Sequence, residues 1–62
     1  MKELKSIYDC KGMKKGDWFK VGSSEFEIQN INDTCANLTR FNHSGYNETF
    51  IRFAEREKFA NI

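Results

Sequence analysis

The stretch that decides the fold of this chain covers residues 15–31 and reads KGDWFKVGSSEFEIQNI. Its first half, from Trp18 to Val21, is a short run of β-prone residues, and the Gly-Ser-Ser that follows is typical of a turn. In its second half Phe26 and Ile28 alternate with polar residues, so one side of a strand faces a core and the other faces water. The stretch predicts a β-hairpin.

Further strands and a short helix are predicted after this hairpin. Ile31 breaks the alternation, which indicates a bulge or the end of the strand near Asn30. The sequence Asn-His-Ser-Gly marks a clear turn between two later strands. At the C-terminus, AEREKFANI favours a short helix that packs Phe59 across an open end of the sheet. The predicted strands lie at about 17–21, 25–31, 34–41 and 46–53.

The chain is expected to form a single domain, residues 1–62, in which residues 1–12 are either part of the fold or a loosely attached segment. Leu4, Ile7 and Tyr8 have the spacing of one helical stripe, which favours a helical turn or two over an irregular edge strand.

The predicted fold class is mainly β with a short terminal helix, as a small antiparallel sheet or an SH3-like barrel of about four to five strands. Residues 15–41 carry a basic loop, Gly-Asp, an aromatic strand, a tight turn and an alternating strand, an order that resembles the start of an SH3-like barrel. The resemblance implies binding of peptides, nucleic acids or other subunits, without choosing among them.

Core size is the main constraint on a chain of 62 residues. A domain of this length buries only about 60% of its unfolded surface, so oligomerisation is a common supplement. Large aromatic side chains compensate in part. The aromatic residues expected to fill the core are Trp18, Phe19, Phe26, Phe41, Phe50, Phe53 and Phe59.

The sequence favours a cytoplasmic protein with no membrane contact. The N-terminal MKELKSIYDC lacks the apolar run of a secretory signal, and no stretch is apolar enough to span a membrane. Cys10 and Cys35 are therefore expected to be reduced and unpaired. Together with His43 they match no zinc-binding spacing, and neither paired carboxylates nor a sheltered Cys–His pair indicates catalysis. We expect no enzyme activity, no cofactor and no metal.

Four asparagines recur every fifth residue, at positions 32, 37, 42 and 47, and each is followed two residues later by Ser or Thr. The pattern matches N-glycosylation sites, but without a secretory signal the match has no consequence. A pentapeptide-repeat coil is also disfavoured, because His and Glu occupy positions where that fold needs Leu or Phe. The asparagines are interpreted as turn and strand residues.

The candidate binding residues are basic and aromatic. Residues 1–20 carry six lysines and three acids, whereas the rest of the chain has a net charge of −2. Strand alternation turns either Trp18 or Phe19 outward, and the outward ring is the better contact residue. The candidate residues are Lys11, Lys14, Lys15, Trp18, Phe19 and Lys20.

Two functions follow from these features. The first is a non-enzymatic protein-binding module that acts as a regulator, inhibitor or accessory subunit. A chain rich in Asn, Lys and Phe is typical of AT-rich genomes such as those of many bacteriophages, so a host protein is one expected partner. The alternative is a nucleic-acid-binding β-barrel, in which the lysines neutralise phosphates and the aromatic side chain stacks on bases.

Overall fold

The computed structural model describes residues 1–56, and these form a mainly β fold with a short terminal helix, as predicted. The helix begins at residues 54–56, and the predicted position of Phe59 lies outside the described residues. The elements before it are β1 (Lys2–Glu3), the 3-10 helix η1 (Ile7–Cys10), β2 (Trp18–Val21), β3 (Ser24–Ile31), β4 (Cys35–Asn42) and β5 (Gly45–Arg52).

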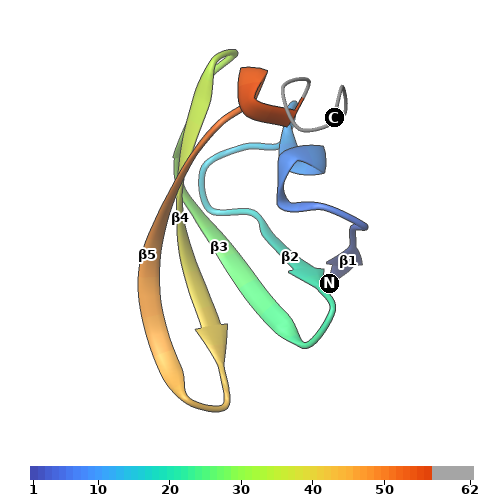
Figure 1. Cartoon of the computed structure of the whole chain (residues 1–62), viewed down its shortest axis with the longest axis vertical. Coiled ribbons are helices and arrows are strands. Elements are labelled where there is room, and N and C mark those ends of the chain that lie inside the picture. Colours follow the sequence, from blue (N-terminus) through green and yellow to red (C-terminus); the bar gives the residue numbers. More distant parts are fainter. Residues whose placement is uncertain (57–62) are drawn as a thin grey trace.

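The five strands form one sheet in the order β1-β2-β3-β4-β5 (Figure 1). Strands β2 to β5 are an antiparallel meander, so residues 15–41, which resemble the start of an SH3-like barrel, supply its first three strands. The sheet is mixed rather than wholly antiparallel, because β1 pairs in parallel with β2 through Lys2 opposite Phe19 and Glu3 opposite Lys20. β1 and β5 are the two edges of the sheet.

A bulge in β3 keeps its apolar residues on one face. The register with β4 shifts between Ile28 and Asn30, which leaves Gln29 as the extra residue. An extra residue reverses the alternation of side chains, so Ile31 returns to the face of Ile28. Ile31 is half-buried and packs against the core, and the predicted bulge is confirmed.

Two asparagines of the five-residue series close turns with their side chains. Asn42 Oδ1 accepts a hydrogen bond from the backbone N–H of Ser44 at 2.9 Å. Asn32 Oδ1 accepts from the N–H groups of Thr34 and Cys35 at 2.8 and 2.9 Å. Such side-chain bonds to nearby backbone are why asparagine favours turns. The other two asparagines of the series lie within β4 and β5, so the interpretation as turn and strand residues is confirmed.

The core lies on one face of the sheet, here called the inner face, which η1 covers (Figure 1). Phe19 and Phe26 are cross-strand partners whose rings stack with centroids 5.1 Å apart. Each large apolar side chain buried in this way contributes about 1.5–3 kcal/mol to the free energy of unfolding. The core residues are Cys10, Phe19, Phe26, Ile28, Ala36, Leu38, Ile51 and Phe53.

Three aromatic residues expected in the core are outside it. Trp18 is 38% exposed, Phe50 is 53% exposed and Phe41 is half-buried. All three belong to the opposite face of the sheet: neighbouring residues of a strand point to opposite sides, Phe19 and Ile51 take the inner positions, and Phe41 lies opposite Tyr46. The N-terminal segment covers only the inner face, which is the reason that these rings stay in contact with water.

The N-terminal segment packs against the core. It forms the short strand β1 and then one helical turn, the four-residue 3-10 helix η1, in agreement with the prediction of a helical turn or two. Ser6 caps η1, since its Oγ accepts a hydrogen bond from the N–H of Tyr8 at 3.2 Å. The predicted apolar stripe of Leu4, Ile7 and Tyr8 is partly buried against the core.

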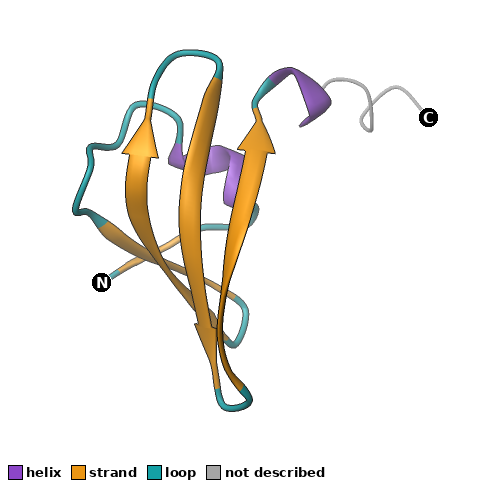
Figure 2. Ribbon diagram, turned by 90° about the vertical axis from the view of Figure 1, so that its left-hand side faces the viewer, coloured by secondary structure: helices purple, strands orange, loops and turns teal. Residues whose placement is uncertain are grey.

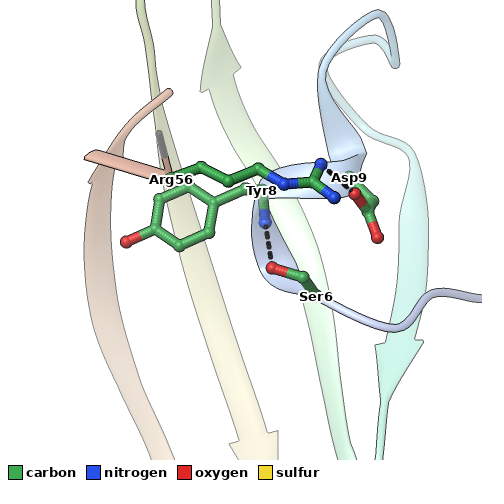
Figure 3. A network of polar contacts seen from close by, with 4 residues as sticks. All are labelled: Ser6, Tyr8, Asp9 and Arg56. Carbon is green, nitrogen blue, oxygen red and sulfur yellow. Dashed lines mark hydrogen bonds and ion pairs between the residues drawn. The ribbon is translucent and has the colours of Figure 1, made fainter. Parts of the chain in front are cut away.

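A polar cluster ties η1 to the start of the terminal helix (Figure 3). The Arg56 side chain reaches past the Tyr8 ring and forms an ion pair with Asp9. The Tyr8 hydroxyl donates a hydrogen bond to Glu55 Oε2 at 3.4 Å. Desolvation and the neighbouring Glu55 carboxylate raise the pKa of Tyr8 above its ordinary value. This cluster therefore helps to hold η1 against the inner face.

Candidate interaction surface

The face of the sheet opposite the core, here called the outer face, is the candidate site. Cross-strand partners point their side chains to the same face, so the strand register defines its members. Figure 2 looks onto this face, with η1 behind the sheet. Its side chains come from Trp18, Lys20, Glu25, Glu27, Asn30, Cys35, Asn37, Thr39, Phe41, Tyr46, Glu48, Phe50 and Arg52.

Three aromatic side chains form a continuous row across the outer face. The rings of Trp18 and Phe41 stack with centroids 5.2 Å apart and an interplanar angle of 29°. Phe41 in turn lies 5.9 Å from the ring of Tyr46, its partner across the β4–β5 hairpin. Tyr46 is 76% exposed, and Phe41, between its two neighbours in the row, is half-buried. We call Trp18, Phe41 and Tyr46 the aromatic row.

A hydrogen-bonded layer fixes the strands beneath part of this surface. Gln29 Nε2 donates to Thr39 Oγ1 at 3.0 Å and to Glu27 Oε1 at 3.1 Å. Thr39 is buried although it belongs to the outer face, because neighbouring side chains lie over it. The bulge residue therefore bridges β3 and β4 on this side of the sheet.

A shallow hollow of about 350 Å³ lies farther along the outer face, on the β5 side. Its rim includes Asn30, Asn37 and Glu48, and the exposed ring of Phe50 forms one wall. Arg52 places its guanidinium 5.8 Å from the centre of the same ring. Phe50 is thus a second exposed aromatic on the outer face.

Charges of both signs surround the aromatic side chains. Glu27 stands directly opposite Trp18, and Glu25 stands between Lys20 and Phe41 in the register. With Glu48 and Arg52 included, carboxylates outnumber cations on this face by one. The outer face therefore presents exposed aromatic rings, and the charged side chains around them have a net charge of −1.

The structure brings together only part of the residues predicted to bind. Trp18 and Lys20 belong to the outer face, and Lys20 is half-buried there. Lys14 and Lys15 are exposed in the loop before β2. Lys11 lies at another part of the molecule, with its Nζ 5.8 Å from the centre of the Phe53 ring.

Phe19 has no exposed surface, and this corrects its place among the predicted binding residues. Its side chain belongs to the core, where it stacks on Phe26. Of the two candidates for the outward ring, the structure selects Trp18. The sequence analysis missed Phe41 and Tyr46 as contact residues. They are equally far from the centre of the predicted Asn-His-Ser-Gly turn, and this spacing could have indicated that they meet.

The two cysteines occupy different environments and both are free thiols. Cys10 is fully buried in the core, and burial raises the pKa of its thiol. Cys35 is half-exposed on the outer face, where its Sγ lies 3.6 Å from Asn32 Oδ1. Cys10, and not Cys35, is therefore the packing cysteine.

Within residues 1–56, no cluster of three or more His, Cys, Asp or Glu side chains is arranged to hold a metal ion. The same part of the chain has no helix long and apolar enough to cross a membrane. His43 is exposed in the β4–β5 turn.

Comparison of the chain with protein-family models, with curated proteins and with solved structures finds no match. The function proposed below therefore depends on the chain's own residues.

Proposed function

We propose that this protein is a non-enzymatic binding module that engages a partner protein through the outer face of its sheet. The observation that carries the proposal is the aromatic row, in which Trp18 stacks on Phe41 and Tyr46 adjoins Phe41 at a tilt, all on one face of the sheet. Aromatic side chains are enriched among the residues that dominate protein interfaces, because they bury a large area at a small cost in conformational entropy.

The charges near the aromatic row favour a protein over a nucleic acid. A phosphate backbone laid across Trp18 would approach the carboxylates of Glu25 and Glu27, and like charges repel. The same carboxylates suit a protein surface that has an apolar cleft bordered by Lys or Arg. The alternative function, nucleic-acid binding, depends on the exposed Lys14 and Lys15 in the neighbouring loop.

The rigid support of the outer face is a second argument for binding. The Gln29 hydrogen bonds and the stacking of Phe41 fix side chains that would otherwise lose entropy on association. A regulator, inhibitor or accessory subunit needs such a surface and no catalytic group. A cytoplasmic location and a bacteriophage origin are both expected from the sequence. Host cytoplasmic proteins are therefore the first partners to test.

The test is an affinity pull-down from a lysate of the source cells, with and without nuclease. Wild type is compared with Tyr46→Ala, which removes an exposed ring, and with Tyr46→Phe, the matched control that keeps the ring. We expect a protein band that survives nuclease, is retained by Tyr46→Phe and is weakened at least tenfold by Tyr46→Ala.

A double variant, Lys14→Glu with Lys15→Glu, separates the two functions. The proposed function predicts that this variant keeps the protein band and that increased salt has little effect on it. Recovery of nucleic acid that is lost in the double variant, and that falls steeply with salt, would overturn the proposal in favour of the alternative.

A further inference from the structure

The two edge strands of the sheet differ in length, and the longer one could pair with a second copy of this chain. β1 is only two residues long, whereas β5 has eight. Among residues 1–56 the only strand neighbour of β5 is β4, and Figure 2 shows β5 along the right-hand edge of the sheet. A long edge strand presents unpaired N–H and C=O groups that can pair with another chain.

β5 lacks three of the devices that commonly prevent edge pairing, namely proline, lysine and a bulge, although it carries the charged residues Glu48 and Arg52. Its sequence, GYNETFIR, contains neither proline nor lysine. Its register with β4 runs without a bulge from Asn42 opposite Gly45 to Cys35 opposite Arg52. Proline, lysine and bulges are the common means by which natural edge strands avoid pairing. In the part of the chain that the structure describes, the free edge of β5 is therefore regular and has no strand paired to it.

The hydrogen bonds to β4 show which backbone groups of β5 face outward. The N–H of Phe53 donates to the carbonyl of Thr34 at 2.9 Å, which continues the register by one residue. Hydrogen-bonded and non-hydrogen-bonded pairs alternate along an antiparallel ladder. The residues whose N–H and C=O groups point away from β4 are thus Tyr46, Glu48, Phe50 and Arg52.

An antiparallel pair of β5 edges must match outward groups with outward groups. This condition is met when the two-fold axis passes through a residue of β5, and not when it passes between two residues. The charges of the side chains that then face each other distinguish the possible registers. An axis at Phe50 places Glu48 opposite the Arg52 of the other copy, twice by symmetry. An axis at Glu48 places two carboxylates opposite each other, and an axis at Thr49 places Glu48 opposite Phe50. Opposite charges stabilise a cross-strand pair and like charges destabilise it.

We propose that two copies of this chain associate through their β5 edges, antiparallel, with the two-fold axis at Phe50. The Phe50 rings of the two copies then meet on the outer face, each flanked by a Glu48–Arg52 pair. The two outer faces become one continuous surface, which extends over both copies.

The terminal helix is compatible with this pairing. Arg56 and Glu55 contact Asp9 and Tyr8 of η1, which lies over the inner face. The chain therefore leaves the plane of the sheet after Phe53, and the register centred on Phe50 uses residues 48–52 as its paired segment. The proposal does not depend on the proposed function, because Tyr46, the member of the aromatic row on β5, lies outside the paired segment 48–52.

The test is the molar mass in solution, measured by sedimentation equilibrium over a range of concentrations up to about 1 mM, the weakest affinity worth detecting. Glu48→Arg and Arg52→Glu each place like charges opposite each other across the axis. We expect either change to raise the dissociation constant of the dimer about tenfold or more. The double variant, Glu48→Arg with Arg52→Glu, restores opposite charges and is expected to restore the dimer.

Glu3→Arg is the matched control, because it makes the same change of charge on the exposed edge strand β1 and is expected to leave the dimer unchanged. Far-UV circular dichroism confirms that each variant is folded. Amide exchange gives a second readout: the N–H groups of Glu48, Phe50 and Arg52 should exchange more slowly as the protein concentration rises.

The proposal is overturned if wild type is a monomer at every concentration. It is also overturned if the single charge reversals leave the dimer intact or if the double variant does not restore it. All of these variants keep the aromatic row, so loss of the dimer and loss of a partner protein can be observed separately.

Discussion

The two faces of this sheet carry similar side chains and meet different environments. On the inner face Phe19 and Phe26 stack with centroids 5.1 Å apart, and on the outer face Trp18 and Phe41 stack with centroids 5.2 Å apart. The inner pair is buried under η1, whereas the outer pair has no covering element in the part of the chain that the structure describes. Stacking is thus common to both faces, and burial depends on the single short segment that covers one of them.

The largest expected difference between the faces is in stability. Phe19→Ala should lower the free energy of unfolding by about 3–5 kcal/mol, because it removes a fully buried ring and leaves a cavity. Trp18→Ala, at the next residue, should cost only about 1 kcal/mol. Urea denaturation measures both. A domain of this size has about 3–9 kcal/mol in total, so Phe19→Leu, expected to cost less than about 1.5 kcal/mol, keeps the site measurable. Equal costs for Phe19→Ala and Trp18→Ala would contradict the contrast between the faces.

The two cysteines give a pH test of the same contrast. Burial raises the pKa of Cys10 in the folded chain, whereas the unfolded thiol titrates near its ordinary pKa of about 8.5. Between these two pKa values the unfolded chain has released the proton that the folded chain still holds. Stability should therefore be constant below about pH 8 and fall as the pH rises through this window, by about 1.4 kcal/mol for each unit by which the pKa is raised.

Denaturation series at pH 7 to 9 measure this slope, below the ordinary tyrosine pKa of about 10, so that Tyr8 contributes little to it. Cys10→Ala should remove the slope, and the matched variant Cys35→Ala should keep it. A slope that disappears with Cys35→Ala instead would show that the outer face, and not the core, contains the protected thiol.

The aromatic row should contribute a smaller, local coupling. A double-mutant cycle of Trp18→Ala and Phe41→Ala should give an interaction energy of about 0.5–1.5 kcal/mol, because the two rings stack. A cycle of Trp18→Ala and Phe50→Ala is the control, since these rings are not in contact and their effects should add. Additive effects for Trp18 and Phe41 would mean that the row is not formed in solution.

The smallest expected effect concerns the ion pair between Asp9 and Arg56, which links η1 to the start of the terminal helix. The side chain of Arg56 is 56% exposed and that of Asp9 is 26% exposed. An exposed ion pair contributes little, so Arg56→Ala should cost about 0.2–1 kcal/mol, and the cost should decrease as salt is added. Thermal denaturation at low and high ionic strength checks this, with Arg52→Ala as a control that removes a cation from the outer face. A larger cost that salt does not change would indicate a tightly buried pair instead.

The sequence predicts most of the meander because its signals are local. Alternation predicted that Phe26 and Ile28 share the buried side of a strand, as found. The break in alternation at Ile31 predicted the bulge. These features depend on neighbouring residues in one strand, and the period of two is sufficient to detect them.

The covered face could not be predicted in the same way. Because side chains alternate along a strand, Trp18 and Phe19 must point in opposite directions. Which of the two rings is buried depends on where η1 packs against the sheet. Docking is a contact between distant parts of the chain. The two-residue strand β1 has no sequence signal either, because its pairing with β2 uses backbone groups and its side chains are exposed. The contact residues Phe41 and Tyr46 were missed for a related reason, since their meeting depends on the hairpin register.

The contacts that join η1 to the start of the terminal helix also have a consequence for folding kinetics. The hairpins from β2 to β5 join residues that are close in the chain, whereas the contacts of η1 with the terminal helix join residues 47 apart. Local contacts form with little loss of loop entropy and distant ones form later. We therefore expect changes in β1 and η1 to accelerate unfolding and to leave the folding rate almost unchanged, which stopped-flow measurements on Ile7→Ala would test. The segment that distinguishes the two faces is then the last part of the molecule to be put in place.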